Sequence, residues 1–270
     1  MEPFAGARAR INRAQEQIDA LDDEFHAFGA REPHLVREIL DPDTGRKRAV
    51  YVVTEELPDA WPAIVGEIAY DLRSALDHVV YDLTVLENDG PLGHTGFPIF
   101  EDEARYDEVT TRGEPAFGSG VFRIRGVNEY AKAAIRRLQP FESRKAAPFD
   151  EPVLSLLHEL NAADRQRTIP LCRVRWPGSR LRGRRPVRDL AFRWGSVLED
   201  GAVIAEWTPS VIDGGVDLDV ELDFDIAFAG WARGETPLVV DVLREIAAAV
   251  AETARILEAT VRLTGERMFV

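Results

Sequence analysis

Residues 216–229 read Val-Asp-Leu-Asp-Val-Glu-Leu-Asp-Phe-Asp-Ile-Ala-Phe-Ala, an almost unbroken alternation of apolar and acidic side chains. Successive side chains of a β-strand point to opposite faces of a sheet. The pattern therefore predicts one long strand, with one face on a core and the other facing water or opposite charge. Residues 168–176, 188–198 and 202–208 also alternate, so we expect an antiparallel sheet of about four strands.

Helical patterns flank this predicted sheet on both sides. Apolar residues recur at steps of three and four in 4–28, 59–87, 127–138, 151–165 and 236–264, which predicts five amphipathic helices. Thr236 and Pro237 are expected to begin the last of these helices, and Gly265 to end it. Near the N-terminus, residues 34–40 and 48–57 surround Asp-Pro-Asp-Thr-Gly at 41–45, which is typical of a β-hairpin.

These elements predict an α+β fold: a helical bundle of about five helices with an N-terminal β-hairpin and an inserted antiparallel sheet of about four strands. The bundle with its hairpin is expected at 1–165 and the antiparallel β region at 166–235. The helix at 236–270 is expected to pack back on the bundle, and a single domain is the alternative. Residues 91–125, with frequent Gly and Pro, are expected to form an irregular connection with a turn or hinge at Gly118-Ser119-Gly120.

The bulk composition is that of an ordinary globular protein. Of 270 residues, 45% are hydrophobic and 30% charged. No apolar run approaches the roughly 18 residues that a membrane helix needs, and the first residues lack the pattern of a secretion signal. Cys172 is the single cysteine, which excludes an internal disulfide. We therefore expect a soluble, cytoplasmic protein that does not associate with a membrane.

Charge is unevenly distributed along the chain. A net charge of −14 argues against a nucleic-acid partner, yet residues 165–193 hold ten arginines and one acidic residue. Compositional bias of a GC-rich genome is one explanation. Some of these arginines can face the acidic side of 217–225 across the predicted sheet. Four others lie in a predicted loop at 177–186 without such partners, and they are the expected RNA contacts: Arg180, Arg182, Arg184 and Arg185.

The long predicted helix at 59–87 carries an arginine and a histidine five positions apart, Arg73 and His78. At 100° per residue they lie about 140° apart around the helix axis, on the two flanks of the apolar stripe. A flanking histidine titrates near neutral pH and can accept a proton from a ribose 2′-hydroxyl. An arginine can bind the phosphate and stabilise the charge that develops on it.

This Arg-x4-His helix resembles the motif of the HEPN superfamily of helical-bundle proteins. The resemblance implies a metal-independent ribonuclease of the toxin or defence kind, with no cofactor, whose motif helices pair in a homodimer that cleaves RNA. It implies that Arg73 binds the phosphate and that His78 is the general base. This chain has Ser74 after the arginine, where the family commonly has Asn, Asp or His, and the inserted sheet is not part of the minimal family fold.

A second resemblance is carried by Leu72 to Val79 together with residues 157–167, which read Leu-His-Glu-Leu-Asn-Ala-Ala-Asp-Arg-Gln-Arg. The two segments are similar to those of a group of functionally uncharacterised bacterial proteins. That group pairs such a helix with an Asn-x-x-Asp-Lys-His-Arg segment, and Gln166 replaces its histidine here. The resemblance implies a shared fold and no particular activity.

A non-catalytic interpretation remains open beside the ribonuclease hypothesis. Arg73 can pair with Asp77 one turn away or reach Asp164 on another helix, and His78 can bond to Ser74 or Asp82. The protein would then be a binding or scaffolding protein with no active site. Carboxylates flank the same helix, but no metal-ligand motif is present, so a solvated acidic face is favoured over a metal site; its members are Glu67, Asp71, His78 and Asp82.

Overall fold

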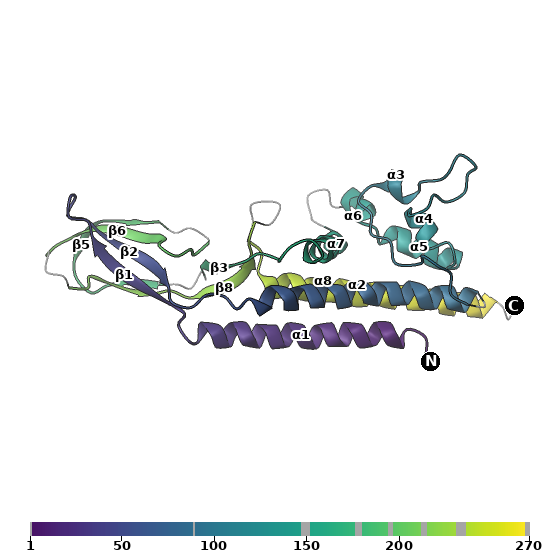
Figure 1. Cartoon of the computed structure of the whole chain (residues 1–270), viewed down its shortest axis with the longest axis horizontal. Coiled ribbons are helices and arrows are strands. Elements are labelled where there is room, and N and C mark those ends of the chain that lie inside the picture. The colour runs from purple at the N-terminus through teal and green to yellow at the C-terminus, as the bar shows by residue number, and fades with distance from the viewer. Residues whose placement is uncertain are drawn as a thin grey trace. The chain divides into compact units, whose positions relative to one another are not determined.

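The computed structural model describes residues 2–88, 90–146, 152–175, 180–193, 197–211, 215–230 and 236–267 (Figure 1). The chain divides into two compact units. The first unit comprises residues 1–19, 63–169 and 242–270, and the second comprises 20–62 and 170–241. The fold is α+β, as predicted, with an N-terminal hairpin and antiparallel sheets.

The first unit is helical and is built on three long helices. It contains most of α1 (Ala5–Gly29), α2 (Ala60–Glu87) and α8 (Val239–Arg267), which run alongside one another in Figure 1. Their apolar residues repeat at helical spacing, and Ile11, Leu72 and Ile246 are each at most 6% exposed. Burial of these stripes against one another stabilises helices of this kind more than intrinsic propensity does. Within the described residues, no helix is both long and apolar enough to cross a bilayer.

Carboxylates on α2 hold α1 in place. Asp71 is buried and binds Arg10 at 2.7 Å and Arg13 at 3.3 Å. Asp82 accepts the backbone N–H of Phe4, one residue before α1, at 2.7 Å. The acidic flank that the sequence pattern assigned to solvent is therefore in part a set of contacts to the neighbouring helix.

Five shorter helices complete the described part of the first unit. Their bounds are α3 Glu103–Tyr106, α4 Gly120–Arg123, α5 Glu129–Arg137, α6 Pro140–Ala146 and α7 Val153–Asp164. The sequence pattern predicts α5 and α7. The other three are four to seven residues long, which is too short for a helical period to be recognised. The connection expected at 91–125 therefore contains two single-turn helices, and Ser119 caps the second by accepting the Phe122 N–H.

Antiparallel sheets form the second unit. The largest has the order β1-β2-β6-β5, with β1 His34–Leu40, β2 Lys47–Val53, β6 Val203–Pro209 and β5 Val187–Phe192. The N-terminal hairpin thus pairs through β2 with β6, a strand much later in the chain, and Lys47 lies opposite Trp207. Two smaller sheets pair β3 (Leu171–Arg175) with β8 (Phe224–Phe228) and β4 (Arg180–Gly183) with β7 (Leu218–Glu221).

The long strand predicted at 216–229 is divided in the structure. Its first part is β7 and its second part is β8, and each pairs with a different partner strand. The apolar alternation persists across the division, because Leu218, Leu222 and Ile226 are all at most 5% exposed. The prediction of one continuous strand was wrong, since alternation reports which side chains are buried and not which backbone they pair with.

Three further predictions were wrong, two on the ends of the last helix and one on the loop at 177–186. The last helix begins at Val239, not near Thr236, because the Pro237 carbonyl accepts the Phe228 N–H and Leu238 bridges to Ala227 beside β8. The same helix continues past Gly265 to Arg267. The predicted loop at 177–186 contains strand β4, while its residues 177–179 lie outside the described part of the chain.

A buried lysine connects the strands of the second unit. Lys47 is 4% exposed, and its ammonium group lies 3.0 Å from Glu38 Oε2 and 2.8 Å from Asp217 Oδ2. Glu38 also accepts the backbone N–H groups of Asp217 and Leu218, and Asp217 accepts the indole N–H of Trp207 at 3.1 Å. Every charge in this network has a partner, which a buried charge requires.

We expect Lys47→Met to lower the free energy of unfolding by about 3–5 kcal/mol, because Glu38 and Asp217 would remain buried without a counter-charge. Equilibrium unfolding in urea measures the loss. Arg184→Met is the matched control: its 3.3 Å pair with Asp219 is solvent-exposed, so the expected loss is under about 1 kcal/mol. A loss of the same small size in both variants would contradict the role assigned to Lys47.

Candidate functional site: an arginine-lined pocket

The extended segment 97–100 lies against α2 and is held there by side chains. Arg73 Nη2 donates to the Phe97 carbonyl at 2.5 Å, and Asp77 Oδ1 accepts the Phe97 N–H at 2.8 Å. Arg73 and Asp77, one helical turn apart, also bind each other at 3.0 Å. The pair therefore binds both the backbone carbonyl and the backbone N–H of Phe97. It also confirms Asp77 as a structural partner of Arg73.

Gln139, which is fully buried, holds the same segment through a second set of bonds. Its side-chain oxygen accepts the Phe100 N–H at 3.1 Å, and its nitrogen donates to the Pro98 carbonyl at 2.9 Å and to the Ile135 carbonyl at 3.0 Å. Segment 97–100 thus satisfies its backbone groups with side chains, as a strand would with a neighbouring strand. Its conformation is fixed by three residues: Arg73, Asp77 and Gln139.

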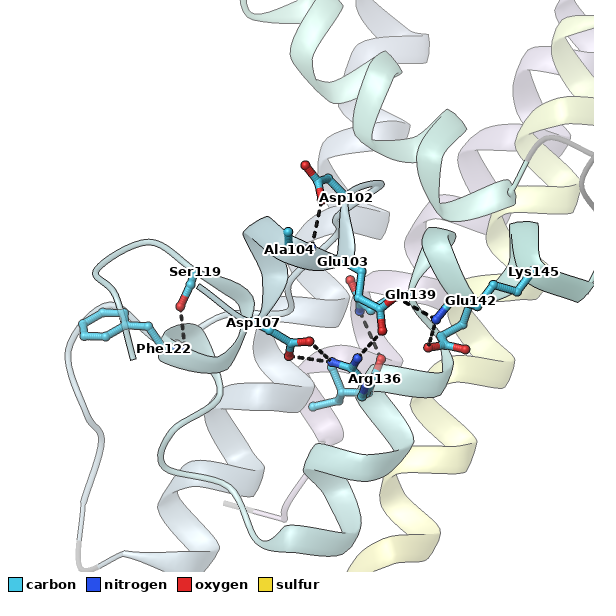
Figure 2. Close-up of polar contacts among 11 residues, drawn as sticks. Asp102, Glu103, Ala104, Asp107, Ser119, Phe122, Arg136, Gln139, Glu142 and Lys145 are labelled. Atoms are coloured by element: carbon cyan, nitrogen blue, oxygen red, sulfur yellow. Dashed lines mark hydrogen bonds and ion pairs between the residues drawn. The ribbon is translucent and has the colours of Figure 1, made fainter. Parts of the chain in front are cut away.

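Ion pairs attach α3 to α5 and α6, as Figure 2 shows. Arg136 binds Asp107 at 2.5 Å and Glu103 at 2.5 Å, and Lys145 reaches the same Glu103 at 2.8 Å. Asp102 caps α3 by accepting the Ala104 N–H at 2.8 Å. Exposed pairs contribute little one by one, but a shared network of this kind restrains the short helix.

A pocket of about 640 Å³ opens beside segment 97–100. The lining residues lie in or next to helices α2, α3, α4 and α7, segment 97–100 and the turn before α4. Four arginines, a histidine and an asparagine face three carboxylates and a few apolar atoms. The lining residues are Arg73, Asp77, Ile99, Phe100, Glu101, Asp102, Arg105, Gly118, Arg123, His158, Asn161, Ala162 and Arg165.

The three carboxylates of the pocket already have partners. Asp77 binds Arg73 and the Phe97 N–H, Glu101 binds Arg144 at 3.1 Å, and Asp102 caps α3. The lining carries four guanidinium groups against these three carboxylates, a formal excess of one positive charge.

Three of the four pocket arginines form no ion pair within the described residues. They are Arg105 and Arg165, which are exposed at the rim, and Arg123, which is half-buried. The guanidinium of Arg123 lies 5.9 Å from the centre of the Phe100 ring, a contact that orients it without neutralising it. Guanidinium forks without a carboxylate are suited to bind an anion.

Two buried donors in the pocket lining have no acceptor within the described part of the chain. One is Nη1 of Arg73, whose side chain is 13% exposed, and the other is the amide nitrogen of Asn161, which is 7% exposed. Leaving a buried donor unpaired costs about 1–3 kcal/mol. Such a donor is available to an acceptor on a water molecule or a ligand.

His158 shares the pocket with these cations. Burial lowers the pKa of the His158 imidazole below its usual value, and the positive charges of Arg73 and Arg123 lower it further. The side chain nevertheless keeps part of its surface open to solvent. At neutral pH the imidazole is therefore uncharged, with one nitrogen that donates and one that accepts.

Arg73 and His78 do not meet in the same pocket of one chain. Arg73 lines the pocket, whereas His78 faces α1 at Gly6, where an added Cβ would lie 2.8 Å from His78 Nδ1. Glycine leaves the space that the imidazole occupies. The hydrogen bond of His78 to Ser74 or Asp82 is not found among the described residues, and Asp82 binds the Phe4 N–H instead.

The four arginines expected to contact RNA lie on or next to β4, beside the acidic strand β7. Arg180 is opposite Glu221 and Arg182 is opposite Asp219. Arg184 binds Asp219 at 3.3 Å, and Arg185 packs against Gly215. The expectation that these residues lack acidic neighbours was wrong, because the segment forms a strand next to 218–221. Their role in RNA binding stays a prediction.

Sequence reasoning overlooked most of the pocket. His158, Asn161 and Arg165 follow helical spacing along one face at the end of α7, and this was the available signal. All three fall in residues 157–167, the segment quoted for the second resemblance. Arg105 and Arg123 come from a region expected to be irregular, where no pattern marks them. Among the described residues, no three His, Cys, Asp or Glu side chains are grouped so as to hold a metal ion.

Comparison with known proteins adds no relative to this description. No protein-family model matches the chain, and no curated protein and no solved structure matches it either. The chain is thus defined by its own geometry, as an α+β protein whose helical unit holds an arginine-lined pocket.

We expect the pKa of His158, followed by NMR titration of its ring signals, to lie below the usual value of about 6.5. Arg123→Ala should raise this pKa, because removing a nearby positive charge favours the protonated imidazole. Arg167→Ala, a change outside the pocket, is the control and should leave it unchanged. A wild-type pKa at or above the usual value would contradict the described surroundings.

Proposed function

We propose that the protein binds a phosphate-bearing ligand in the arginine-lined pocket. One observation carries the proposal: Arg105, Arg123 and Arg165 line the pocket without ion pairs in the described residues, and two buried donors of the same lining lack acceptors there. Phosphate oxygens accept several hydrogen bonds at once and match the planar fork of arginine. The proposal is a specific form of the non-catalytic interpretation, in which the protein binds a partner and has no active site.

The size of the pocket favours a phosphate ester over inorganic phosphate. A volume of about 640 Å³ lies in the range that holds small organic ligands. Ile99, Phe100 and Ala162 add apolar surface to the wall, which suits an organic group next to the phosphate. We therefore expect the anionic group to bind the arginines while the rest of the ligand fills the remaining space.

Binding of inorganic phosphate and of sulfate, measured by isothermal titration calorimetry, tests the proposal directly. We expect Arg165→Ala and Arg123→Ala each to weaken binding about tenfold or more, since a hydrogen bond to a charged group contributes about 1.5–3 kcal/mol. Arg73 is left in place in this experiment because it also holds Phe97.

Arg167→Ala is the matched control, two residues from Arg165 and outside the pocket lining. It should retain wild-type affinity. Equal weakening by Arg165→Ala and Arg167→Ala would indicate attraction by net charge alone and would contradict a built site. No binding of phosphate, sulfate or ribose 5-phosphate to the wild-type protein would end the proposal.

A metal-independent ribonuclease of HEPN type is a second candidate, favoured by the position of Arg73 in a pocket that suits phosphate. Because Arg73 and His78 have different surroundings within one chain, a second chain would have to bring His78 to the pocket. This candidate therefore requires a homodimer, whereas ligand binding does not.

The ribonuclease candidate predicts cleavage of mixed RNAs in the presence of a chelator, with a loss of about 100-fold or more in His78→Ala. Gel analysis of the products measures the rate, and His26→Ala on exposed surface serves as the control. Cleavage that is equal in wild type and His78→Ala, or no cleavage at all, would rule out His78 as the base.

A further inference from the structure

Phe117 is an exposed aromatic residue directly next to the arginine-lined pocket. Its side chain is 75% exposed, the highest value among the large hydrophobic residues that the structure describes. The next residue, Gly118, lines the pocket, and consecutive Cα atoms are about 3.8 Å apart. A large apolar ring is thus kept in solvent at the edge of a site rich in positive charge.

Neighbouring rings hold Phe117 in this exposed position. Its ring centre lies 5.1 Å from that of Phe122 and 5.3 Å from that of His94, at interplanar angles of 60° and 75°. The Arg125 guanidinium lies 4.0 Å from the centre of the Phe122 ring and also restrains that ring. Neither tilted contact lies parallel to the Phe117 ring, so the ring keeps open surface for stacking.

The backbone next to Phe117 links it to the pocket. Gly118 has φ +88°, a conformation that residues with a Cβ rarely adopt. Ser119 then caps α4, which carries Arg123 into the pocket. The aromatic ring and the pocket arginine therefore belong to one short, hydrogen-bonded turn of the chain, which limits their movement relative to each other.

We propose that the ligand is a nucleoside phosphate whose phosphate binds the pocket arginines and whose base stacks on Phe117. The inference rests on the proposed binding of a phosphate-bearing ligand and adds the chemistry of the group beside the phosphate. Proteins bind bases without sequence preference by combining an aromatic platform with a cationic groove. The nucleotide can be free or part of single-stranded RNA, since both present a base next to a phosphate.

The test compares two ligands that differ only in the base, AMP and ribose 5-phosphate, by calorimetry on the full chain. We expect wild-type protein to bind AMP about tenfold more tightly or better, since stacking of one base contributes about 1–3 kcal/mol. Phe117→Ala should remove that difference and leave the affinity for ribose 5-phosphate unchanged. Phe117→Trp should retain it, and Phe117→Leu should lose most of it.

Val109→Ala, at another exposed apolar position, is the control and should change neither affinity. Equal affinity of the wild-type protein for AMP and ribose 5-phosphate would overturn the role of Phe117 but leave the proposed phosphate site intact. Failure of both ligands to bind would overturn the phosphate site itself. Equal weakening of both by Phe117→Ala would mean that the ring only shapes the pocket, which also contradicts the inference.

An oligoadenylate identifies the source of the nucleotide. If affinity rises from AMP to the oligonucleotide, and Phe117→Ala removes the rise, single-stranded RNA is the ligand. If AMP and the oligonucleotide bind equally, and Phe117→Ala weakens both, a free nucleotide is the ligand. Either result supports the shared chemistry of a base on Phe117.

Discussion

The contact of Arg73 and Asp77 with the backbone of Phe97 is the interaction on which the helical unit's pocket depends. One side chain supplies a donor and the other an acceptor, so together they replace the partner strand that segment 97–100 lacks. A buried arginine and its carboxylate are costly to desolvate unless further hydrogen bonds compensate. The Phe97 amide and carbonyl supply that compensation. The same geometry commits Nη2 of Arg73 to the fold, while Nη1 is buried without an acceptor among the described residues.

Because different nitrogens of Arg73 have different surroundings, a structural role of this residue is hard to distinguish from a functional one. The sequence alone allows two interpretations of Arg73, a phosphate ligand or a partner of Asp77. The pair with Asp77 is present, and Arg73 still lines a pocket with three arginines that form no ion pair within the described part of the chain. A side chain with several donors can serve both purposes, because satisfying one edge of the guanidinium does not satisfy the other.

Long elements with a clear period could be predicted from the sequence, and local pairings could not. The three long helices and the hairpin follow from apolar spacing, because burial imposes that spacing. The split of 216–229 into β7 and β8 does not follow, since both strands present the same alternation. Asp217 shows the limit well. Alternation places it on the outward face, yet it is 1% exposed because Lys47, distant in sequence, supplies a counter-charge.

The pairing of β4 with β7 bears on how the second unit selects a strand register. Arg180 and Arg182 face Glu221 and Asp219 across the ribbon. A slip of one residue would place each guanidinium opposite an apolar residue and no longer opposite a carboxylate. The attraction between the opposite charges would then be lost without replacement. Charge pairing between the arginine-rich strand and the acidic strand thereby favours one register of β4 on β7. Substitutions that invert charge on one strand are tolerated best when the facing residue inverts as well.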